Sequence, residues 1–209
     1  MTIVRSGNMT MDYRQIITSL VSQHEEICIP DGRAPAAVAL ILRQGCSGLE
    51  ILFIQRAAHE QDPWSGHLAF PGGRLEPGEE PRQAAEREVM EEIGLDLSSA
   101  RYLGRLTEVS GMTLPVRVAC FVYGVDGCCA APVLNEEVYS AFWIRLEDLI
   151  APERHITATV HFDDSDHEVP AIQLPQVHTP VLWGLTYRLV VQFLETCCGH
   201  ELEADRKRW

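Results

Sequence analysis

The sequence predicts an α/β fold in which a mixed β-sheet is sandwiched between α-helices. Apolar runs with β-branched residues alternate with stretches of helical periodicity, an order typical of layered α/β proteins. The chain has 209 residues, 46% of them hydrophobic and 22% charged, which suits one well-buried domain. The sequence contains no internal repeat. We therefore expect a single domain over residues 31–209, with a helical segment, residues 1–30, packed on it.

Each element follows from a local pattern. The first helix is amphipathic, with Ile16, Ile17, Leu20 and Val21 on one side. The last two strands form a hairpin across the acidic turn at residues 163–166. The predicted strands are residues 36–42, 49–54, 102–106, 116–123, 138–144, 155–162 and 169–174, and the predicted helices are residues 11–25, 81–93, 146–149 and 181–194.

The second helix has clear start and stop signals. Pro81 suits the first turn, because its φ is fixed near the helical value and its missing N–H would have had no partner there. Gly94 suits the position just beyond the last turn, where the backbone is commonly left-handed. Between them Ala85, Val89 and Ile93 recur every four residues, and this apolar stripe should face a core.

Three carboxylates lie on a neighbouring face of the same helix. At roughly 100° per residue, Glu88, Glu91 and Glu92 cluster together. At about 5 Å and an effective dielectric near 20, each pair repels by on the order of 3 kcal/mol. A divalent cation reverses the sign of that interaction, and oxygen-only ligands suit Mg²⁺ or Mn²⁺. A glutamate-rich helix face is more commonly just solvated. The surrounding residues are therefore needed to distinguish a metal site from a solvated face.

Residues 73–95 fit the pattern G-x5-E-x7-R-E-U-x-E-E-x-G-U, where U is aliphatic, at every fixed position. This is the pattern of the Nudix box, and the chain resembles the Nudix hydrolases. The agreement favours a metal site over a solvated helix face. The fixed positions are Gly73, Glu79, Arg87, Glu88, Glu91, Glu92 and Gly94.

The resemblance implies a Nudix fold and the hydrolysis of a nucleoside diphosphate linked to another moiety X. It implies that Glu88, Glu91 and Glu92 bind magnesium or manganese ions, with the backbone carbonyl of Gly72 as a further ligand. The metal would neutralise the diphosphate, lower the pKa of a bound water molecule and hold that water in line with one phosphorus.

The remaining positions of the box have supporting roles in the family. The resemblance implies that Arg87 and Glu79 hold the loop and helix together through charge pairing. Gly73 and Gly94 belong to the structural support of the box.

A further carboxylate is expected from a loop late in the chain. In many Nudix enzymes a loop glutamate binds another metal or acts as general base, and Glu137 matches that position better than Glu136. A solvated loop carboxylate and a helix glutamate acting as base stay open as alternatives. The expected catalytic residues are Glu91, Glu92, Glu137 and Arg87.

The segment before the box resembles that of the coenzyme A pyrophosphatase branch. It matches at Leu52, Arg56, Ala57, Gly66 and residues 70–73. It departs at Ile54, where threonine is expected, and at Gln61, which occupies the region of a second arginine. Coenzyme A carries a 3′-phosphate that an arginine commonly binds. The substrate is therefore expected to be CoA-like, with ADP-ribose or a nucleotide sugar as the alternative.

Three loop residues are candidates for contact with the substrate. Arg56 can reach a phosphate or pair with an acidic neighbour. Trp64 can stack on a base or only pin the loop to the core. His67 can touch the substrate or be a hydrogen-bonded loop histidine.

Composition excludes several classes of protein. The net charge of −13, from 17 basic and 30 acidic residues, opposes general nucleic-acid binding. No apolar run approaches a bilayer span, and no hydrophobic signal core is present, so we expect neither a membrane partner nor export. The seven cysteines form no C-x-x-C pair, which favours a reduced, cytoplasmic protein without structural zinc.

The competing functional class is a nucleotide-binding Nudix module without catalysis. Such modules commonly lose box glutamates, whereas this chain keeps all of them. We therefore expect an enzyme acting on a small-molecule diphosphate, with a homodimer possible.

Overall fold

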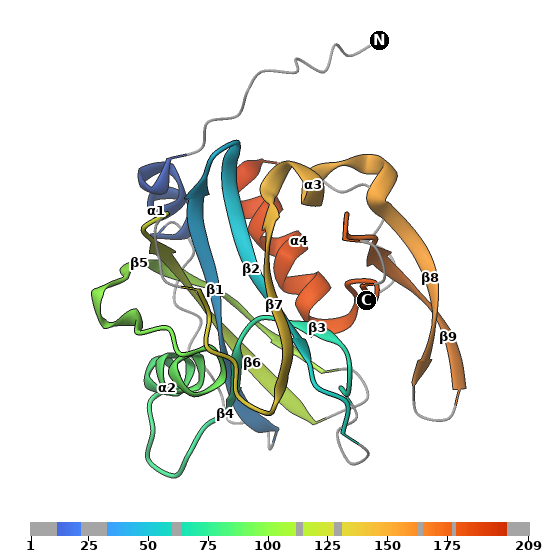
Figure 1. Cartoon of the computed structure of the whole chain (residues 1–209), viewed down its shortest axis with the longest axis horizontal. Coiled ribbons are helices and arrows are strands. Elements are labelled where there is room, and N and C mark those ends of the chain that lie inside the picture. Colours follow the sequence, from blue (N-terminus) through green and yellow to red (C-terminus); the bar gives the residue numbers. More distant parts are fainter. Residues whose placement is uncertain are drawn as a thin grey trace.

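The computed structural model describes residues 12–21, 33–59, 64–111, 115–127, 131–162, 165–176 and 179–199. In this part of the chain a large mixed sheet separates helix α2 (Pro81–Ile93) on one face from α1 (Tyr13–Val21) and α4 (Gly184–Cys198) on the other (Figure 1). The predicted fold class is therefore confirmed.

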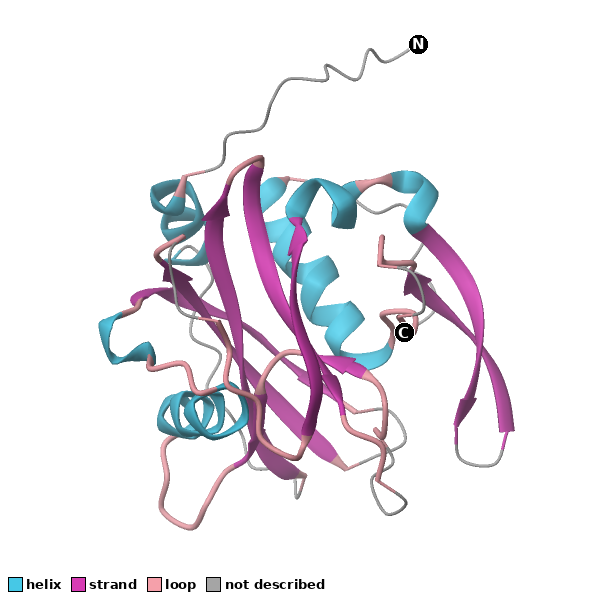
Figure 2. Ribbon diagram, viewed as in Figure 1, coloured by secondary structure: helices cyan, strands magenta, loops and turns pink. Residues whose placement is uncertain are grey.

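The sheet combines parallel and antiparallel pairs (Figure 2). Its main path runs in the order β3-β2-β1-β6-β5, with β4 paired to β1 and β7 paired to β2. The β1–β6 pair is parallel and the other pairs are antiparallel. The strands are β1 (Ala34–Gly45), β2 (Gly48–Arg56), β3 (Leu68–Ala69), β4 (Gly72–Arg74), β5 (Arg101–Ser110), β6 (Val116–Val125) and β7 (Val138–Arg145).

Strand β1 shows why the sheet needs helices on both faces. Successive side chains of a strand point to opposite faces. Leu40 and Leu42 join the core cluster that contains α1 and α4, whereas Ala39 and Ile41 join the cluster that contains α2. Each of these four residues is 0% exposed. The central strand therefore belongs to two apolar cores at once, which explains its nearly continuous apolar sequence.

The late hairpin differs from its prediction in the bounds of its second strand, predicted as residues 169–174. Strands β8 (His155–Phe162) and β9 (Ser165–Ile172) form a separate two-stranded sheet, which extends beside α4 in Figure 1. The predicted turn at residues 163–166 is wrong in its second half, because Ser165 and Asp166 already belong to β9. Across the strands, His161 Nδ1 lies 2.9 Å from Asp166 Oδ1. The pairing of β8 with β9 thus continues through this polar pair, into residues that were predicted as part of the turn.

Helix α4 begins later than predicted and ends later too. Residues 181–194 were the predicted range, whereas the helix spans Gly184–Cys198. Leu182 forms an antiparallel bridge with Ile172, with N···O distances of 2.8 and 2.9 Å in the two directions. This bridge keeps the chain extended up to Trp183. Gly184, with φ of +68°, then makes the turn into the helix.

The other elements keep their type; α2 has its predicted bounds, and the rest change theirs. Strands β3 and β4 are additional to the prediction, and β5 extends beyond the predicted residue 106. The predicted helix 11–25 corresponds to α1, and residues 11 and 22–25 lie outside the described residues. The short helices are α3 (Leu146–Ile150), η1 (Leu97–Ser99) and η2 (Pro152–Arg154). Within the described ranges, no helix has both the length and the apolarity needed to span a membrane.

Candidate active site

Helix α2 is held at both ends as its sequence predicts. Pro81 is its first residue, and the N–H of Glu80 donates to Gln83 Oε1 over 3.2 Å. Gly94 has φ of 65° and donates its N–H to Met90 O, which closes the helix in a left-handed cap. The predicted stripe of Ala85, Val89 and Ile93 is 0% exposed. The helix is therefore fixed in rotation, with its glutamates beside the core-facing stripe.

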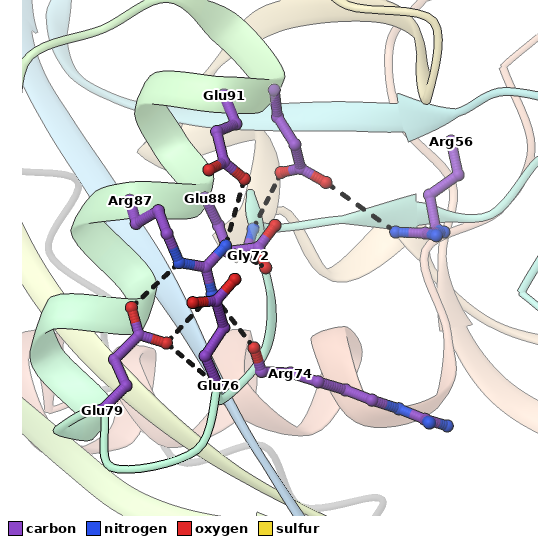
Figure 3. Close-up of polar contacts among 9 residues, drawn as sticks. Arg56, Gly72, Arg74, Glu76, Glu79, Arg87, Glu88 and Glu91 are labelled. Atoms are coloured by element: carbon purple, nitrogen blue, oxygen red, sulfur yellow. Dashed lines mark hydrogen bonds and ion pairs between the residues drawn. The ribbon is translucent and has the colours of Figure 1, made fainter.

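Arg87 holds the box together through its guanidinium group (Figure 3). It donates to both carboxylate oxygens of Glu79, over 2.9 and 3.0 Å, and to the carbonyl of Arg74 over 3.2 Å. The same group contacts Glu88 over 2.9 Å and Glu91 over 3.1 Å. The bond to Glu79 is the main reason that the pKa of Arg87 is raised, and the pKa of Glu79 is lowered in return. The bidentate contact between Arg87 and Glu79 thereby fixes the loop before α2 to the helix.

Glu92 is buried at the centre of the site, with 2% of its surface exposed. Its Oε2 accepts the N–H of Gly72 over 2.9 Å, and Arg56 Nη1 lies 3.9 Å from its Oε1. Burial raises the pKa of Glu92 to about 8, and the charges of Glu88 and Glu137 add to that rise. The bond from Gly72 and the charge of Arg56 oppose it.

Two glycines allow the backbone to come close to these carboxylates. A Cβ on Gly73 would lie 2.4 Å from Glu88 Oε1, inside van der Waals contact. A Cβ on Gly72, whose φ is +149°, would lie 2.3 Å from the carbonyl oxygen of Ala37 on β1. Any larger residue would push the loop away from α2 or from the sheet.

Glu88 shares the charge environment of Glu92. Its pKa is raised mainly by burial, and the charges of Glu91 and Glu137 add to the effect. Its hydrogen bond with Arg87 opposes the rise. The ionised carboxylates therefore destabilise one another in the absence of a cation.

The loop before β7 brings Glu137 to the same place. The N–H of Asn135 donates to Glu92 O over 3.1 Å, and Asn135 Oδ1 accepts the N–H of Glu137 over 2.9 Å. The carbonyl of Glu137 accepts the N–H of Ala57 over 2.8 Å. Glu137 lines the cavity described below, whereas Glu136 does not. The loop is thus anchored to the end of α2 and to the end of β2.

These residues fit a divalent cation by their chemistry. Glu88, Glu92 and Glu137 provide oxygen donors only, the type that Mg²⁺ and Mn²⁺ prefer. Their mutual repulsion is what a cation would relieve. Among the described residues, no three acidic, histidine or cysteine side chains form a ready cluster for a metal ion. The guanidinium of Arg87 pairs with Glu88 and with Glu91, which is itself 55% exposed.

A cavity of about 780 Å³ extends from the carboxylates across the sheet. The three predicted substrate residues, Arg56, Trp64 and His67, all line it. The N–H of Arg56 donates to His67 O over 3.0 Å, and the N–H of His67 donates to Trp64 O over 3.0 Å. The structure therefore brings the upstream loop and the box glutamates to one cavity. Of the residues predicted for the site, Gly72, Gly73, Glu88, Glu92, Glu137, Arg56, Trp64 and His67 line the cavity, whereas Glu79, Arg87, Glu91 and Gly94 do not.

The far half of the cavity was not predicted from the sequence. It is built by the late hairpin and by the first turns of α4. These segments contain no motif with fixed residue spacing of the kind that identifies the box. The available signal in the sequence was the Leu182-to-Thr186 segment, which resembles the carboxy-terminal helix of the coenzyme A pyrophosphatase branch. The unpredicted lining residues include His59, Phe162, His167, Trp183, Leu185 and Arg188.

Comparison with known protein families gives one match. The model of the NUDIX domain matches residues 32–163. The site glutamates, Arg56, Trp64 and His67 lie inside this range, whereas β9 and α4 lie beyond it.

Several individual proteins are also similar to this chain over part of its length. An uncharacterized protein of Schizosaccharomyces pombe is 36% identical over 111 residues, which are 49% of this chain and 34% of that protein. The match therefore spans about a third of the relative's length. The uncharacterized Nudix hydrolase NudL of Yersinia pestis is 25% identical over 150 residues, 69% of this chain and 71% of that protein. A solved MutT/nudix family protein from Enterococcus faecalis has a TM-score of 0.57 at 17% identity, covering 90% of this chain and 70% of that one, a similarity of fold alone.

Proposed function

This chain belongs to the Nudix domain family of hydrolases, and from that premise we propose that it is a metal-dependent pyrophosphohydrolase. Its substrate is a nucleoside diphosphate linked to another moiety, with coenzyme A or a CoA-like derivative as the first candidate. One observation carries the proposal. Glu88, Glu92 and Glu137 line a cavity together with Arg56, so carboxylates and a guanidinium face one space. An anionic diphosphate is compatible with three carboxylates only when cations lie between them.

The site residues are proposed to have different roles in catalysis. Glu88, Glu91, Glu92 and the carbonyl of Gly72 would hold Mg²⁺ or Mn²⁺. When bound, the cation supplies charge neutralisation and makes a water molecule more acidic. Glu137 is proposed to accept the proton of the attacking water, since it reaches the cavity from a loop and its backbone is anchored on both sides. A glutamate of α2 is the alternative base.

Arg56 and Arg87 are proposed to act differently. Arg56 lines the cavity near Glu92, where it can reach a phosphate oxygen. Arg87 does not line the cavity, and its contacts are to the box itself. It is therefore a positioning residue for the loop and for Glu88.

The upstream loop supports a CoA-like substrate. Its residues Arg56, Trp64 and His67 line the cavity, and Arg56 is one of the positions that resemble the coenzyme A pyrophosphatase branch. ADP-ribose or a nucleotide sugar stays the alternative, because Gln61 occupies the region of the branch's second arginine. Gln61 itself lies outside the described residues.

A product assay tests the proposal. Purified protein is incubated with Mg²⁺ or Mn²⁺ and with coenzyme A, ADP-ribose and several nucleotide sugars, and the phosphomonoester products are identified. Glu92→Gln should abolish most turnover. Glu86→Gln is the matched control, because Glu86 lies on the same helix but bonds to Arg82 and Tyr123 instead of facing the cavity. Nucleotide binding without turnover on any substrate would instead favour a non-catalytic module.

A further inference from the structure

The second half of the cavity is built partly by residues beyond the part of the chain that matches the NUDIX domain. The NUDIX model ends at residue 163, whereas Trp183, Leu185 and Leu189 line the cavity from beyond it. The glutamates and Arg56, to which the proposed diphosphate chemistry is assigned, lie in the first half. The second half is therefore the part of the cavity in which the moiety X can be recognised.

Trp183 is the best-fixed ring of this second half. It makes an edge contact with His67, with centroids 4.9 Å apart and planes at 65°, and another with Phe162, at 5.9 Å and 74°. The bridge between Leu182 and Ile172 holds the residue before it, and Gly184 turns the chain directly after it. Two rings contact it and the bridge fixes the backbone beside it, so Trp183 presents an ordered apolar surface whose binding of a ligand costs little side-chain entropy.

The floor beside these rings is aliphatic. It comes from neighbouring positions of β1 and β6 on the sheet and from the first turns of α4. A surface of this kind binds apolar or aromatic groups through burial, whereas sugar hydroxyls placed against it would lose hydrogen bonds to water. Two charged side chains also line the cavity here. Arg188 already donates to Ser110 O over 2.6 Å, and burial lowers its pKa, whereas Glu168 of β9 is exposed. The aliphatic lining residues are Ala36, Val38, Val116, Val118, Leu185 and Leu189.

We propose that Trp183 and Phe162, with this aliphatic floor, form the subsite for X, and that X is an uncharged apolar or aromatic group rather than a free sugar. This inference rests on the proposed diphosphate hydrolysis. It makes Trp183 a specificity-determining residue that lies beyond the part of the chain matching the NUDIX domain. An aliphatic arm and a second nucleobase both meet this description of X. The substrates used in the test distinguish these two possibilities.

Three substrates with the same ADP half test the subsite. ADP-ribose carries a free sugar as X, dephospho-coenzyme A carries a pantetheine arm, and diadenosine diphosphate carries a second base. The wild-type protein should show kcat/KM at least roughly tenfold higher for one of the last two than for ADP-ribose. Trp183→Ala should remove about that preference, mainly through KM, while ADP-ribose hydrolysis changes less than about twofold. Trp183→Phe should restore most of the loss.

Trp143→Ala is the matched control. Trp143 is also partly buried, but it packs under the guanidinium of Arg43, 4.2 Å from the ring centroid, and does not line the cavity. Its loss should change the three substrates equally. A wild-type preference for ADP-ribose, or the same substrate profile in Trp183→Ala and Trp143→Ala, would overturn the subsite.

The two proposals can fail separately. Binding of the three compounds is also measured by calorimetry on the Glu92→Gln protein. If no compound is hydrolysed by the wild type but the base- or arm-bearing compound binds more tightly than ADP-ribose, and Trp183→Ala removes that difference, the subsite stands and the hydrolysis fails. If all three bind equally or not at all, the subsite is wrong.

Discussion

Glu92 and Asp148 are the buried charged side chains among the described residues, 2% and 8% exposed, and their surroundings differ. Asp148 is paired with two guanidinium groups, those of Arg145 at 2.9 Å and Arg154 at 3.4 Å. Glu92 has one backbone N–H and an arginine at 3.9 Å. A carboxylate buried with so little compensation is costly to ionise. The two ion pairs thus explain how Asp148 can be buried, whereas Glu92 requires a cation or a proton for its burial to be stable.

The first prediction concerns pH in the presence of a chelator. The folded pKa of Glu92 is about 8, against an ordinary value of 4.5. Because the folded value is the higher one, the stabilisation is complete at acidic pH and is lost as pH rises through the folded pKa. Each pKa unit corresponds to about 1.4 kcal/mol, so the loss is on the order of a few kcal/mol.

Urea unfolding of the metal-free protein at several pH values measures this loss. Glu92→Gln stays neutral and can still accept the Gly72 N–H, so its stability should vary less over this range and exceed that of the wild type at pH near 8. Glu86→Gln should keep the pH profile of the wild type. Parallel profiles for the wild type and Glu92→Gln would contradict the assignment of the buried charge.

The second prediction concerns the geometry of Arg87. Its fork spans both oxygens of Glu79, which a lysine cannot reproduce. Arg87→Lys should therefore lower kcat nearly as much as Arg87→Ala, by roughly one to two orders of magnitude, with a smaller change in KM. Hydrogen exchange should rise in the loop between Arg74 and Glu79. Lost activity without faster exchange there would contradict a positioning role.

At the scale of the elements, the loop that carries Glu137 is coupled to the box helix through Asn135. Asn135 donates its N–H to Glu92 O at the end of α2, and its Oδ1 accepts the N–H of Glu137. The carbonyl groups at a helix end need partners, and this loop provides one for α2. The position of Glu137 relative to Glu92 therefore depends on Asn135.

The third prediction follows from that coupling. Asn135→Ala should lower kcat roughly tenfold, because Glu137 loses one of its two backbone anchors, that to Asn135 Oδ1, and keeps the bond with Ala57. Asn135→Asp keeps an acceptor oxygen and should retain more activity. In a Glu137→Gln background the Asn135→Ala change should add little, since the two residues act as one unit. Additive effects in steady-state assays of the double variant would show that Asn135 does not act through Glu137.

The elements also show what could be predicted from the sequence. The box was predictable because its information is local: Pro81 and Gly94 mark the helix ends, and the glutamates lie within two turns. The start of α4 was not, because it is set by the pairing of Leu182 with Ile172, a partner ten residues earlier that local patterns do not reveal. The start of β9 was missed for the same reason, since the polar pair of His161 and Asp166 carries no apolar signal.

At the scale of the whole molecule, the cavity joins segments that are far apart in the chain. Ala36 and Val38 come from the first strand of the sheet, Glu92 from α2 and Trp183 from the start of α4. Glu88 and Glu92 were predictable as a pair from their spacing. Their meeting with Trp183 depends on the helices that cover opposite faces of the sheet, which only the folded structure supplies.

The last prediction follows from this assembly, because a cation that binds the folded site stabilises the entire domain. Any ligand that binds only the folded state raises the free energy of unfolding, by about 2.7 kcal/mol at a hundredfold excess over Kd. The wild type should therefore unfold at a higher temperature in Mg²⁺ or Mn²⁺ than in EDTA. The increase should grow as pH rises toward the folded pKa of Glu92, about 8, because protons compete with the metal for the carboxylates. Scanning calorimetry measures both effects. Glu92→Gln should lose most of the metal-dependent increase while Glu86→Gln keeps it, and an equal increase in both variants would place the cation elsewhere in the chain.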